Sequence, residues 1–329
     1  MKICVYFQPK EKDNIFEGAR LRKSIKGALE ENNIVYAKDI IDTYDLIHFI
    51  SLDDELKIND AKEERIPIVF SALNCESDNR AKILTEKDGI YILSPKAIRT
   101  LNKADVVLVS DNDSKLLLEE NGIMTKIEIV SPGVNLKRFQ FNDKLEENIF
   151  YNYYQLEKDQ KFVTIIGTYK DQELRKELIS IAELCPDIHF FYFGNARIGK
   201  VMRMMKSIPN NLRFCPLTDN EIYCSMMKCA SIYLSLDNSH HCPITLLDAA
   251  ASKTQIVALE PTKLNKEMLK KLNAYIGDNP SAVAEIINKL IKGELENKAD
   301  LAYEYAKENS LENVGKRLVE IYQSLIGGK

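Results

Sequence analysis

Several features are scarce or missing in this sequence, and each absence excludes a class of protein. The 329 residues include no tryptophan, 13 glycines and 10 prolines, which excludes collagen-like and low-complexity chains. No apolar run approaches the ~20 residues that cross a bilayer. The 45 lysines and arginines nearly balance the 49 aspartates and glutamates. We therefore do not expect a nucleic-acid partner.

The motifs of several enzyme classes are missing as well. The chain has no G-x-G-x-x-G, P-loop, G-x-S-x-G, H-E-x-x-H or C-x-x-C pattern. Nothing in it therefore predicts a dinucleotide cofactor, a serine hydrolase, a zinc protease or a redox dithiol. The seven cysteines are scattered through apolar segments, as free thiols are in proteins of the reducing cytoplasm. We expect a cytoplasmic protein that needs no metal.

What the sequence does contain is a regular alternation of short apolar runs with segments of helical length. Many runs, such as VVLVS and FVTIIG, are continuously apolar, as are strands that helices cover on both faces. The candidate strands are Lys2–Phe7, Ile34–Ala37, Asp45–Ile50, Pro67–Ala72, Val106–Ser110, Lys126–Val130, Phe162–Thr168, Ile188–Gly194, Leu212–Cys215, Ile232–Leu236, Gln255–Leu259 and Ala274–Ile276. The pattern predicts an α/β fold with two doubly wound parallel sheets.

The two predicted sheets are separated by a polar, tyrosine-rich connection at about residues 133–161. We place an N-terminal Rossmann-like domain at residues 1–140 and a C-terminal one at residues 141–309. Residues 310–329 have the pattern of an amphipathic helix with Ser310 as its N-cap, and we expect it to pack back toward the N-terminal domain. Ligands of open parallel sheets sit outside the carboxyl ends of the strands. The cleft between the domains is therefore the predicted binding site.

Two segments that carry a glycine are candidates for binding phosphate. Gly18 lies where the loop after the first strand turns into a helix, and Gly194 and Asn195 end a later apolar strand. The amide groups of a helix N-terminus receive anions. The basic residues of the first helix are Arg20, Arg22, Lys23 and Lys26. The alternative for both segments is a solvated basic face, which in the first helix would make at most a screened contact with anionic lipid.

A third candidate segment follows the strand at residues 232–236. A polar loop that contains His240 leads into a helix whose first amide groups, those of Ile244 and Thr245, would face a phosphate. Asp248 follows one turn later in the same helix. The alternative interpretation is that the loop only caps the helix and that its histidines are solvated.

The third segment, together with the turn at residues 131–139, resembles a known family. This family is the GT-B retaining glycosyltransferases, which include sucrose synthases, mannosyltransferases and bacterial glycolipid glucosyltransferases. Its E-G-F-G-L-P-L-L-E-A-M-A-C-G-T-P-V-V-A corresponds without a gap to H-H-C-P-I-T-L-L-D-A-A-A-S-K-T-Q-I-V-A, His240 to Ala258. Its P-N-G-V-D-x-x-x-F corresponds to Ser131–Phe139, and its glycine after the first strand to Gly18. Similar segments follow in order along nearly the whole chain. The short length, the S-P-G-V-N turn and the segment KVMRMMKSIPNNLRF look nearest to the branch that glucosylates diacylglycerol lipids.

The resemblance implies a GT-B fold, in which two Rossmann-like domains face each other across a cleft. It implies transfer of a hexose from a nucleoside diphosphate sugar, here a UDP-sugar, to a hydroxyl of a glycan or glycolipid, without a metal or other cofactor. The donor-binding residues that it implies are Gly18, Thr168, Lys170, Gly194, Asn195, Ile244, Thr245 and Asp248. The candidate catalytic residues are His240 beside the donor sugar, Asp248 at the donor ribose, and Glu76 and Asp78 near the acceptor.

The donor motif departs from the family pattern at its charged positions. The family's two glutamates become His240 and Asp248. Its diphosphate-clamping arginine corresponds to Thr168, with Lys170, Arg175 or Lys176 as candidate replacements. Because the leaving diphosphate gains negative charge, loss of cationic donors would slow the transfer. The alternative is therefore a catalytically degenerate subunit that supports a second, active glycosyltransferase or binds a glycan. A glycolipid acceptor would place the protein peripherally at the inner face of a membrane.

Overall fold

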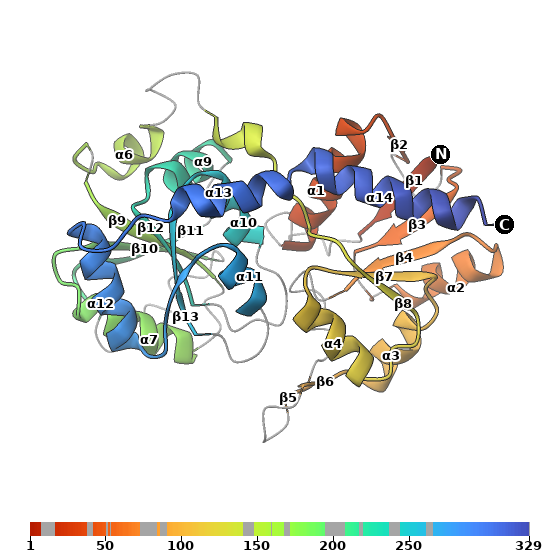
Figure 1. Ribbon diagram of the computed structural model, residues 1–329, viewed down its shortest axis with the longest axis horizontal. Coiled ribbons are helices and arrows are strands. Elements are labelled where there is room, and N and C mark those ends of the chain that lie inside the picture. Colours follow the sequence, from red (N-terminus) through yellow and green to blue (C-terminus); the bar gives the residue numbers. More distant parts are fainter. Residues whose placement is uncertain are drawn as a thin grey trace.

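The two predicted sheets are present, and each is covered by helices on both faces (Figure 1). The computed structural model describes residues 1–7, 17–37, 42–50, 52, 54–72, 84–85, 91–140, 148–158, 160–167, 172–194, 208–216, 220–236, 244–260 and 266–328. Within them each sheet has six strands, and all pairings inside both sheets are parallel. The predicted α/β class with two doubly wound sheets is confirmed.

The N-terminal sheet has the strand order β2-β1-β3-β4-β7-β8. Its strands are β1 (Lys2–Tyr6), β2 (Val35–Tyr36), β3 (Leu46–Phe49), β4 (Ile68–Ser71), β7 (Val106–Val109) and β8 (Lys126–Ile129). The helices are α1 (Glu17–Glu31), α2 (Glu55–Glu63), α3 (Pro95–Leu101) and α4 (Asn112–Glu120). A separate antiparallel pair, β5 (Leu84–Thr85) and β6 (Tyr91–Ile92), was not predicted. Two residues are too few to form a periodic pattern.

The C-terminal sheet has the strand order β11-β10-β9-β12-β13-β14. Its strands are β9 (Phe162–Ile166), β10 (His189–Gly194), β11 (Leu212–Pro216), β12 (Ile232–Ser235), β13 (Gln255–Leu259) and β14 (Tyr275–Gly277). Its helices are α6 (Ile149–Tyr154), α7 (Gln172–Glu183), α9 (Asn220–Cys229), α10 (Ile244–Ala251), α11 (Lys266–Lys271), α12 (Pro280–Ile291) and α13 (Ala299–Glu308). A 3-10 turn, η2 (Leu136–Phe139), lies in the connection between the sheets.

The last helix, α14 (Leu311–Ile326), returns to the N-terminal half and runs beside α1 (Figure 1). The Ser310 side chain accepts a hydrogen bond from the Asn313 amide, so the predicted N-cap is confirmed. The buried residues of this helix are Leu311, Val314, Gly315, Leu318, Ile321 and Tyr322. The described part of the chain therefore crosses between the halves twice, once between Val130 and Phe139 and once between α13 and α14.

A buried hydrogen-bonded group fixes α14 to the sheet. The His48 ring lies between two hydroxyls, with Nδ1 2.6 Å from Tyr322 Oη and Nε2 2.8 Å from Ser71 Oγ. Burial lowers the pKa of His48 to about 3, so the ring is neutral in the folded protein. A neutral ring donates one hydrogen bond and accepts the other, and this satisfies both nitrogens.

This histidine predicts a loss of stability in mild acid. In the unfolded chain its pKa is about 6.5, so between pH 6.5 and pH 3 the unfolded state binds a proton that the folded state does not. The contribution of neutral His48 is fully present above pH 6.5 and is lost as the pH falls toward 3. From pH 7 to pH 5 the free energy of unfolding should fall by about 2 kcal/mol from this group alone. Urea unfolding should show a smaller fall for His48→Asn, and equal falls in both proteins would contradict the assignment.

Candidate functional site

The two halves meet where helices begin at the carboxyl ends of their strands. On one side α1, which follows β1, contacts α10, which follows β12. On another side α4, which follows β7, contacts α11, which follows β13. The carboxyl edge of a parallel sheet is where open α/β proteins bind ligands. The candidate site therefore lies between the halves, as the sequence predicts.

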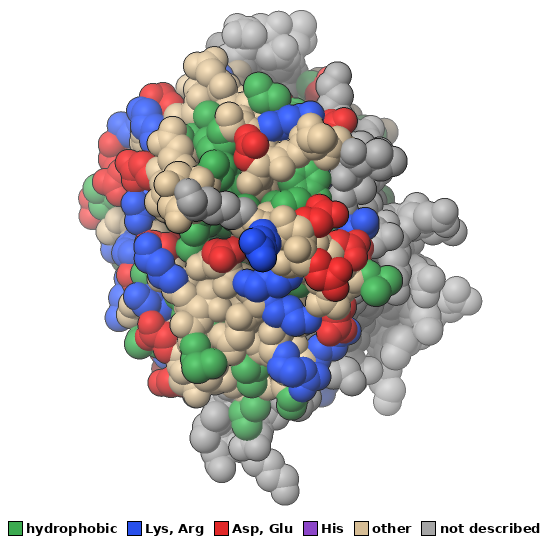
Figure 2. All heavy atoms as spheres, turned by 90° about the vertical axis from the view of Figure 1, so that its right-hand side faces the viewer, with side chains coloured by type: hydrophobic (Ala, Val, Ile, Leu, Met, Phe, Trp, Pro, Cys, Tyr) green, Lys and Arg blue, Asp and Glu red, His purple; other side chains and the backbone are tan. Residues whose placement is uncertain are grey.

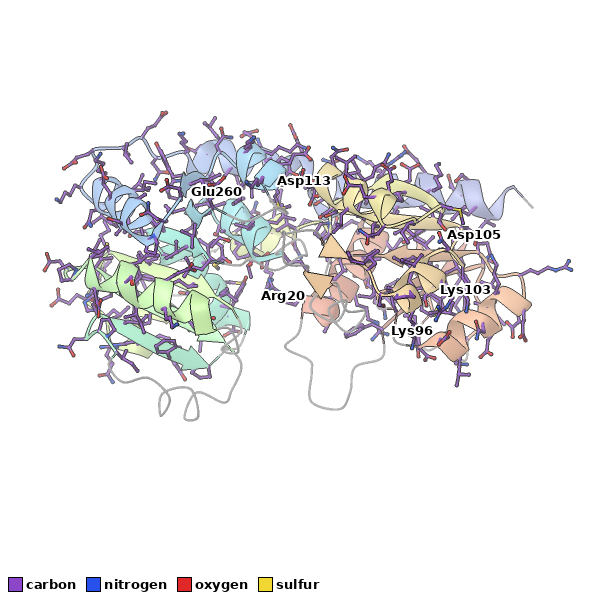
Figure 3. The ribbon with its side chains drawn as sticks, turned by 90° about the horizontal axis from the view of Figure 1, so that it is seen from below. Arg20, Lys96, Lys103, Asp105, Asp113 and Glu260 are labelled. Carbon is purple, nitrogen blue, oxygen red and sulfur yellow. The ribbon has the colours of Figure 1, made fainter. Side chains whose placement is uncertain are left out.

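Asp248, in the middle of α10, is the polar centre of this meeting point. Its residue surface is only 3% exposed, yet it carries a carboxylate. Arg20 of α1 reaches across from the other half and pairs through Nη2 with Oδ2 of Asp248, and Figure 3 shows Arg20 directed into the space between the halves. A second guanidinium, Nη1 of Arg138 in the connection, lies 3.6 Å from the same oxygen. A buried carboxylate is tolerated only with such partners.

Tyr223 of α9 completes the group. Its hydroxyl donates a hydrogen bond to Asp248 Oδ2 at 2.7 Å and accepts one from Arg20 Nη2 at 3.1 Å. The guanidinium carbons of Arg20 and Arg138 lie 5.2 and 5.0 Å from the centre of its ring, within cation–π range. Burial above all, and the neighbouring Asp248 carboxylate to a lesser extent, raise the pKa of Tyr223 well above its ordinary value. The hydroxyl therefore stays protonated and able to donate.

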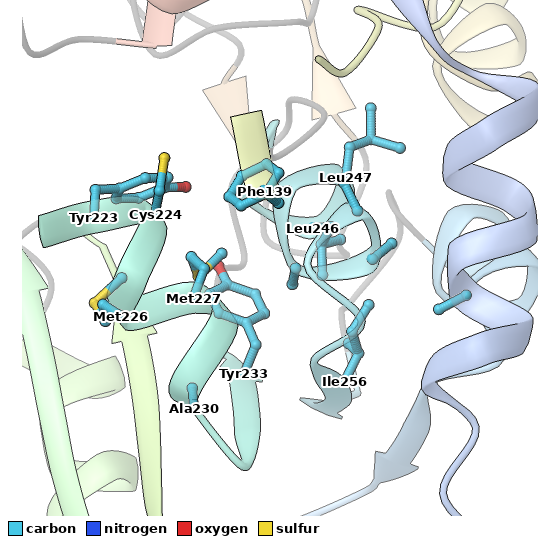
Figure 4. Close-up of a cluster of buried hydrophobic side chains, with 14 of the residues drawn as sticks. Phe139, Tyr223, Cys224, Met226, Met227, Ala230, Tyr233, Leu246, Leu247 and Ile256 are labelled. Carbon is cyan, nitrogen blue, oxygen red and sulfur yellow. The ribbon is translucent and has the colours of Figure 1, made fainter. Parts of the chain in front are cut away.

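A packed apolar cluster holds these residues in place. Figure 4 shows side chains of α9, among them Tyr223 and Met227, beside Leu246 and Leu247 of α10 and Phe139 of the connection. Phe139 directly follows Arg138, so the packing of the ring fixes the backbone that carries the guanidinium. All eight residues of α10 are buried. The site is therefore built on rigid elements on its C-terminal side.

The first residues of α10 are oriented by both halves of the chain. Ile244 packs into the apolar cluster of the N-terminal sheet, α1 and α14. Thr245 accepts a hydrogen bond at 2.9 Å from the hydroxyl of Tyr233 in β12. The first amide groups of a helix have no acceptor within the helix, so they are suited to bind an anion.

The structure brings together some of the predicted site residues. Ile244, Thr245 and Asp248 lie on one helix, and Gly18 lies in the first turn of α1, two residues before Arg20. Gly194 ends β10, at the same edge of the sheet as the start of α10. The remaining candidates lie outside the described residues, and they are His240, Glu76, Asp78, Thr168, Lys170 and Asn195.

The basic face of the first helix is not the exposed patch that a lipid contact would need. Arg20 is bound to Asp248, and Arg22 donates from Nε to the Val5 carbonyl at 3.1 Å. Lys26 lies over the ring of Tyr36, 4.6 Å from its centre, and of the four basic residues only Lys23 is classed as exposed. Lysines and arginines are interspersed with aspartates and glutamates over the end face of the N-terminal half (Figure 2). Internal acceptors therefore hold Arg20 and Arg22, and a lipid contact through this helix stays a prediction.

A second polar contact joins the halves through two helix N-termini. The Asn112 amide of α4 donates to Glu267 Oε2 at 3.0 Å, and the Glu267 amide of α11 donates to Asp113 Oδ2 at 3.4 Å. Burial, followed by the charges of Asp111 and Glu267, raises the pKa of Asp113. In the view of Figure 3, Asp113 lies at the same gap between the halves as Arg20. This contact therefore adds to that of Arg20 with Asp248 in joining the two halves.

Among the described residues, no group of three or more His, Cys, Asp or Glu side chains is placed to hold a metal ion. No helix in the described part of the chain is both long and apolar enough to cross a membrane.

Comparison with solved structures defines the class of fold. HepE of Anabaena, in complex with UDP and glucose, superposes with a TM-score of 0.74 over 98% of this chain and 100% of its own, at 13% identity. Sucrose-phosphate synthase of Thermosynechococcus elongatus superposes with a TM-score of 0.68 over 98% of this chain and 81% of its own, at 14% identity. The chain therefore has the GT-B fold of glycosyltransferases.

Comparison of sequences adds one relative. The chain is 22% identical to a processive diacylglycerol alpha-glucosyltransferase of Acholeplasma laidlawii over 340 residues, which cover 99% of both chains. No protein-family profile matches. These similarities confirm the resemblance to GT-B glycosyltransferases that the motifs from Gly18 to Ala258 indicate.

The sequence did not reveal the partners of Asp248. Arg20 stands out only as one of several cations on a helix, and Arg138 only as part of a turn. Tyr223 lies in an amphipathic segment in which a tyrosine is unremarkable. The three residues are 228, 110 and 25 positions from Asp248, so no local spacing could have joined them.

Proposed function

We propose that this protein is a hexosyltransferase that moves a sugar from a UDP-sugar to a hydroxyl of a glycolipid or glycan. The observation that carries the proposal is the position of Asp248, a buried carboxylate one turn into α10, at the place where the two halves of a GT-B fold meet. The full-length similarity to a glucosyltransferase and the fold shared with a protein crystallised with UDP and glucose support it.

In this proposal α10 binds the nucleotide part of the donor. Asp248 would accept hydrogen bonds from the ribose hydroxyls, and the amides of Ile244 and Thr245 would face the diphosphate. His240 would lie beside the donor sugar. The other donor contacts would come from Gly18, Thr168, Lys170, Gly194 and Asn195. Preorganised amides and cations at the leaving diphosphate stabilise the charge that develops there as the glycosidic bond breaks.

The acceptor would lie on the N-terminal side, near Glu76 and Asp78, either of which would take the proton of the attacking hydroxyl. The relative from Acholeplasma supports a diacylglycerol-type acceptor. Such a substrate requires a peripheral contact with a membrane.

Calorimetric titration with UDP, UDP-glucose and GDP-mannose tests the donor assignment. We expect the uridine nucleotides to bind with micromolar dissociation constants and GDP-mannose to bind more weakly. Transfer of labelled glucose to diacylglycerol in mixed-lipid vesicles then tests the acceptor. If no nucleotide binds, the hexosyltransferase assignment fails. A degenerate subunit would then be the better interpretation, and it should co-purify with a second glycosyltransferase.

A further inference from the structure

Three separate parts of the chain converge on one oxygen atom. Oδ2 of Asp248 is contacted by Arg20 from the N-terminal half, by Arg138 from the connection and by Tyr223 from the C-terminal half. Arg20 and Tyr223 are also hydrogen-bonded to each other. The orientation of this carboxylate therefore depends on how the two halves are docked.

The other carboxylate oxygen, Oδ1, accepts none of these hydrogen bonds. Within the described residues, the side-chain hydrogen bonds to Asp248 are both donated to Oδ2. The donors on Oδ2 fix the plane of the carboxylate, and they thereby fix the direction in which Oδ1 points. An acceptor that is oriented before binding loses less rotamer entropy when a hydroxyl donates to it.

We propose that Arg20 is a positioning residue for donor binding, which acts across the interface by orienting Asp248 toward the ribose of the nucleotide. This inference rests on the proposed function, because it takes the ribose as the ligand of Asp248. Its consequence is that the N-terminal half contributes to nucleotide affinity through a side chain that does not touch the nucleotide.

Two other roles for Arg20 make different predictions. If Arg20 bound the diphosphate directly, replacing it would weaken the binding of UDP and of deoxy-UDP by the same factor. If Arg20 only held the halves together, breaking the contact between the Asn112 amide and the Glu267 carboxylate would have the same effect. The positioning role predicts instead that the preference for ribose over deoxyribose falls when Arg20 is removed.

The experiment is calorimetric titration of the full chain with UDP, 2′-deoxy-UDP and 3′-deoxy-UDP. The variants are Arg20→Ala, Arg20→Lys, Asp248→Asn and the double variant Arg20→Ala/Asp248→Asn. The controls are Lys23→Ala, an exposed cation on the same helix, and Glu267→Ala, which removes the hydrogen bond from the Asn112 amide across the halves.

We expect Arg20→Ala to weaken the binding of UDP at least tenfold. In this variant UDP should bind less than twofold more tightly than at least one of the two deoxynucleotides. Arg20→Lys should restore part of the UDP affinity and part of the preference for ribose. The double variant should bind UDP no more weakly than Asp248→Asn alone, and both controls should stay within about twofold of the wild type. The proposal would be overturned by additive losses of UDP affinity in the double variant or by an unchanged ribose preference in Arg20→Ala. An equal loss of UDP affinity in Glu267→Ala would also overturn it.

Failure of the proposed function would look different. If the wild-type chain binds no uridine nucleotide, the donor assignment fails and the ribose role of Arg20 fails with it. Urea unfolding without nucleotide then reports on the contact itself. The Arg20→Ala and Asp248→Asn losses are expected to be less than additive there, whether or not UDP binds.

Discussion

Replacing Asp248 by alanine is expected to lower the free energy of unfolding by about 2–4 kcal/mol and to abolish binding of UDP. The substitution removes the one anion that two guanidinium groups and the Tyr223 hydroxyl share. Loss of one partner of a buried ion pair costs about 3–5 kcal/mol. The lower range is appropriate because the side chains of Arg20 and Arg138 are 24% and 28% exposed and can regain water.

Urea unfolding and calorimetry of the same preparations measure both effects. Asp300→Ala is the matched control, because Asp300 is also an ion-paired aspartate, with Lys253, but its side chain is 83% exposed. It should change the free energy of unfolding by less than about 0.5 kcal/mol. An Asp248→Ala protein that is as stable as the control would show that the buried group contributes nothing to the docking of the halves.

Replacing Gly315 by alanine is expected to destabilise the protein by about 2 kcal/mol. A Cβ atom at this position would lie 2.2 Å from the carbonyl oxygen of Ala28 and 2.1 Å from Nδ2 of Asn32. Asn32 bridges the two helices by donating to the Ala28 and Glu312 carbonyls, so the added methyl group would also break this bridge. Overpacking costs about 1–3 kcal/mol or more, and the higher helix propensity of alanine returns up to ~1 kcal/mol.

Gly315→Leu should move α14 away from α1 and expose Tyr322 and His48. Hydrogen exchange would then be faster throughout α14 but not in α12 of the other half. Lys316→Ala, at the next and exposed position, is the control and should leave exchange unchanged. Normal protection of α14 in the leucine variant would contradict the close contact between the helices.

Most of the fold could be predicted from the sequence because its signal is local. Each predicted strand begins and ends within two residues of the observed one, since a continuous apolar run marks a strand that is buried on both faces. The signal for α14 is also local, because its N-cap at Ser310 and the spacing of its apolar residues can be seen within one segment of the sequence. The exceptions were β5 and β6, which are too short to have a pattern.

The candidate site could be predicted only in part. Resemblance to a family drew attention to Gly18 and to the segment from His240 to Asp248, which precede or begin helices. It does not show that α1 and α10 touch. Helical spacing gives the direction of a side chain but not what lies in that direction, so the acceptors of Arg20 and Arg22 could not be predicted.

The sequence by itself determined the α/β class, the two sheets, the N-cap of the last helix and the helix that carries Asp248. Each of these depends on neighbours within a few residues, where hydrophobic period and capping act. Only the tertiary structure decided the partners of that aspartate. Its ion pair with Arg20 spans 228 residues and exists because the two halves are docked at the carboxyl ends of their sheets. Burial makes such a pair energetically important, and burial at an interface is a property of the assembled chain and not of any segment.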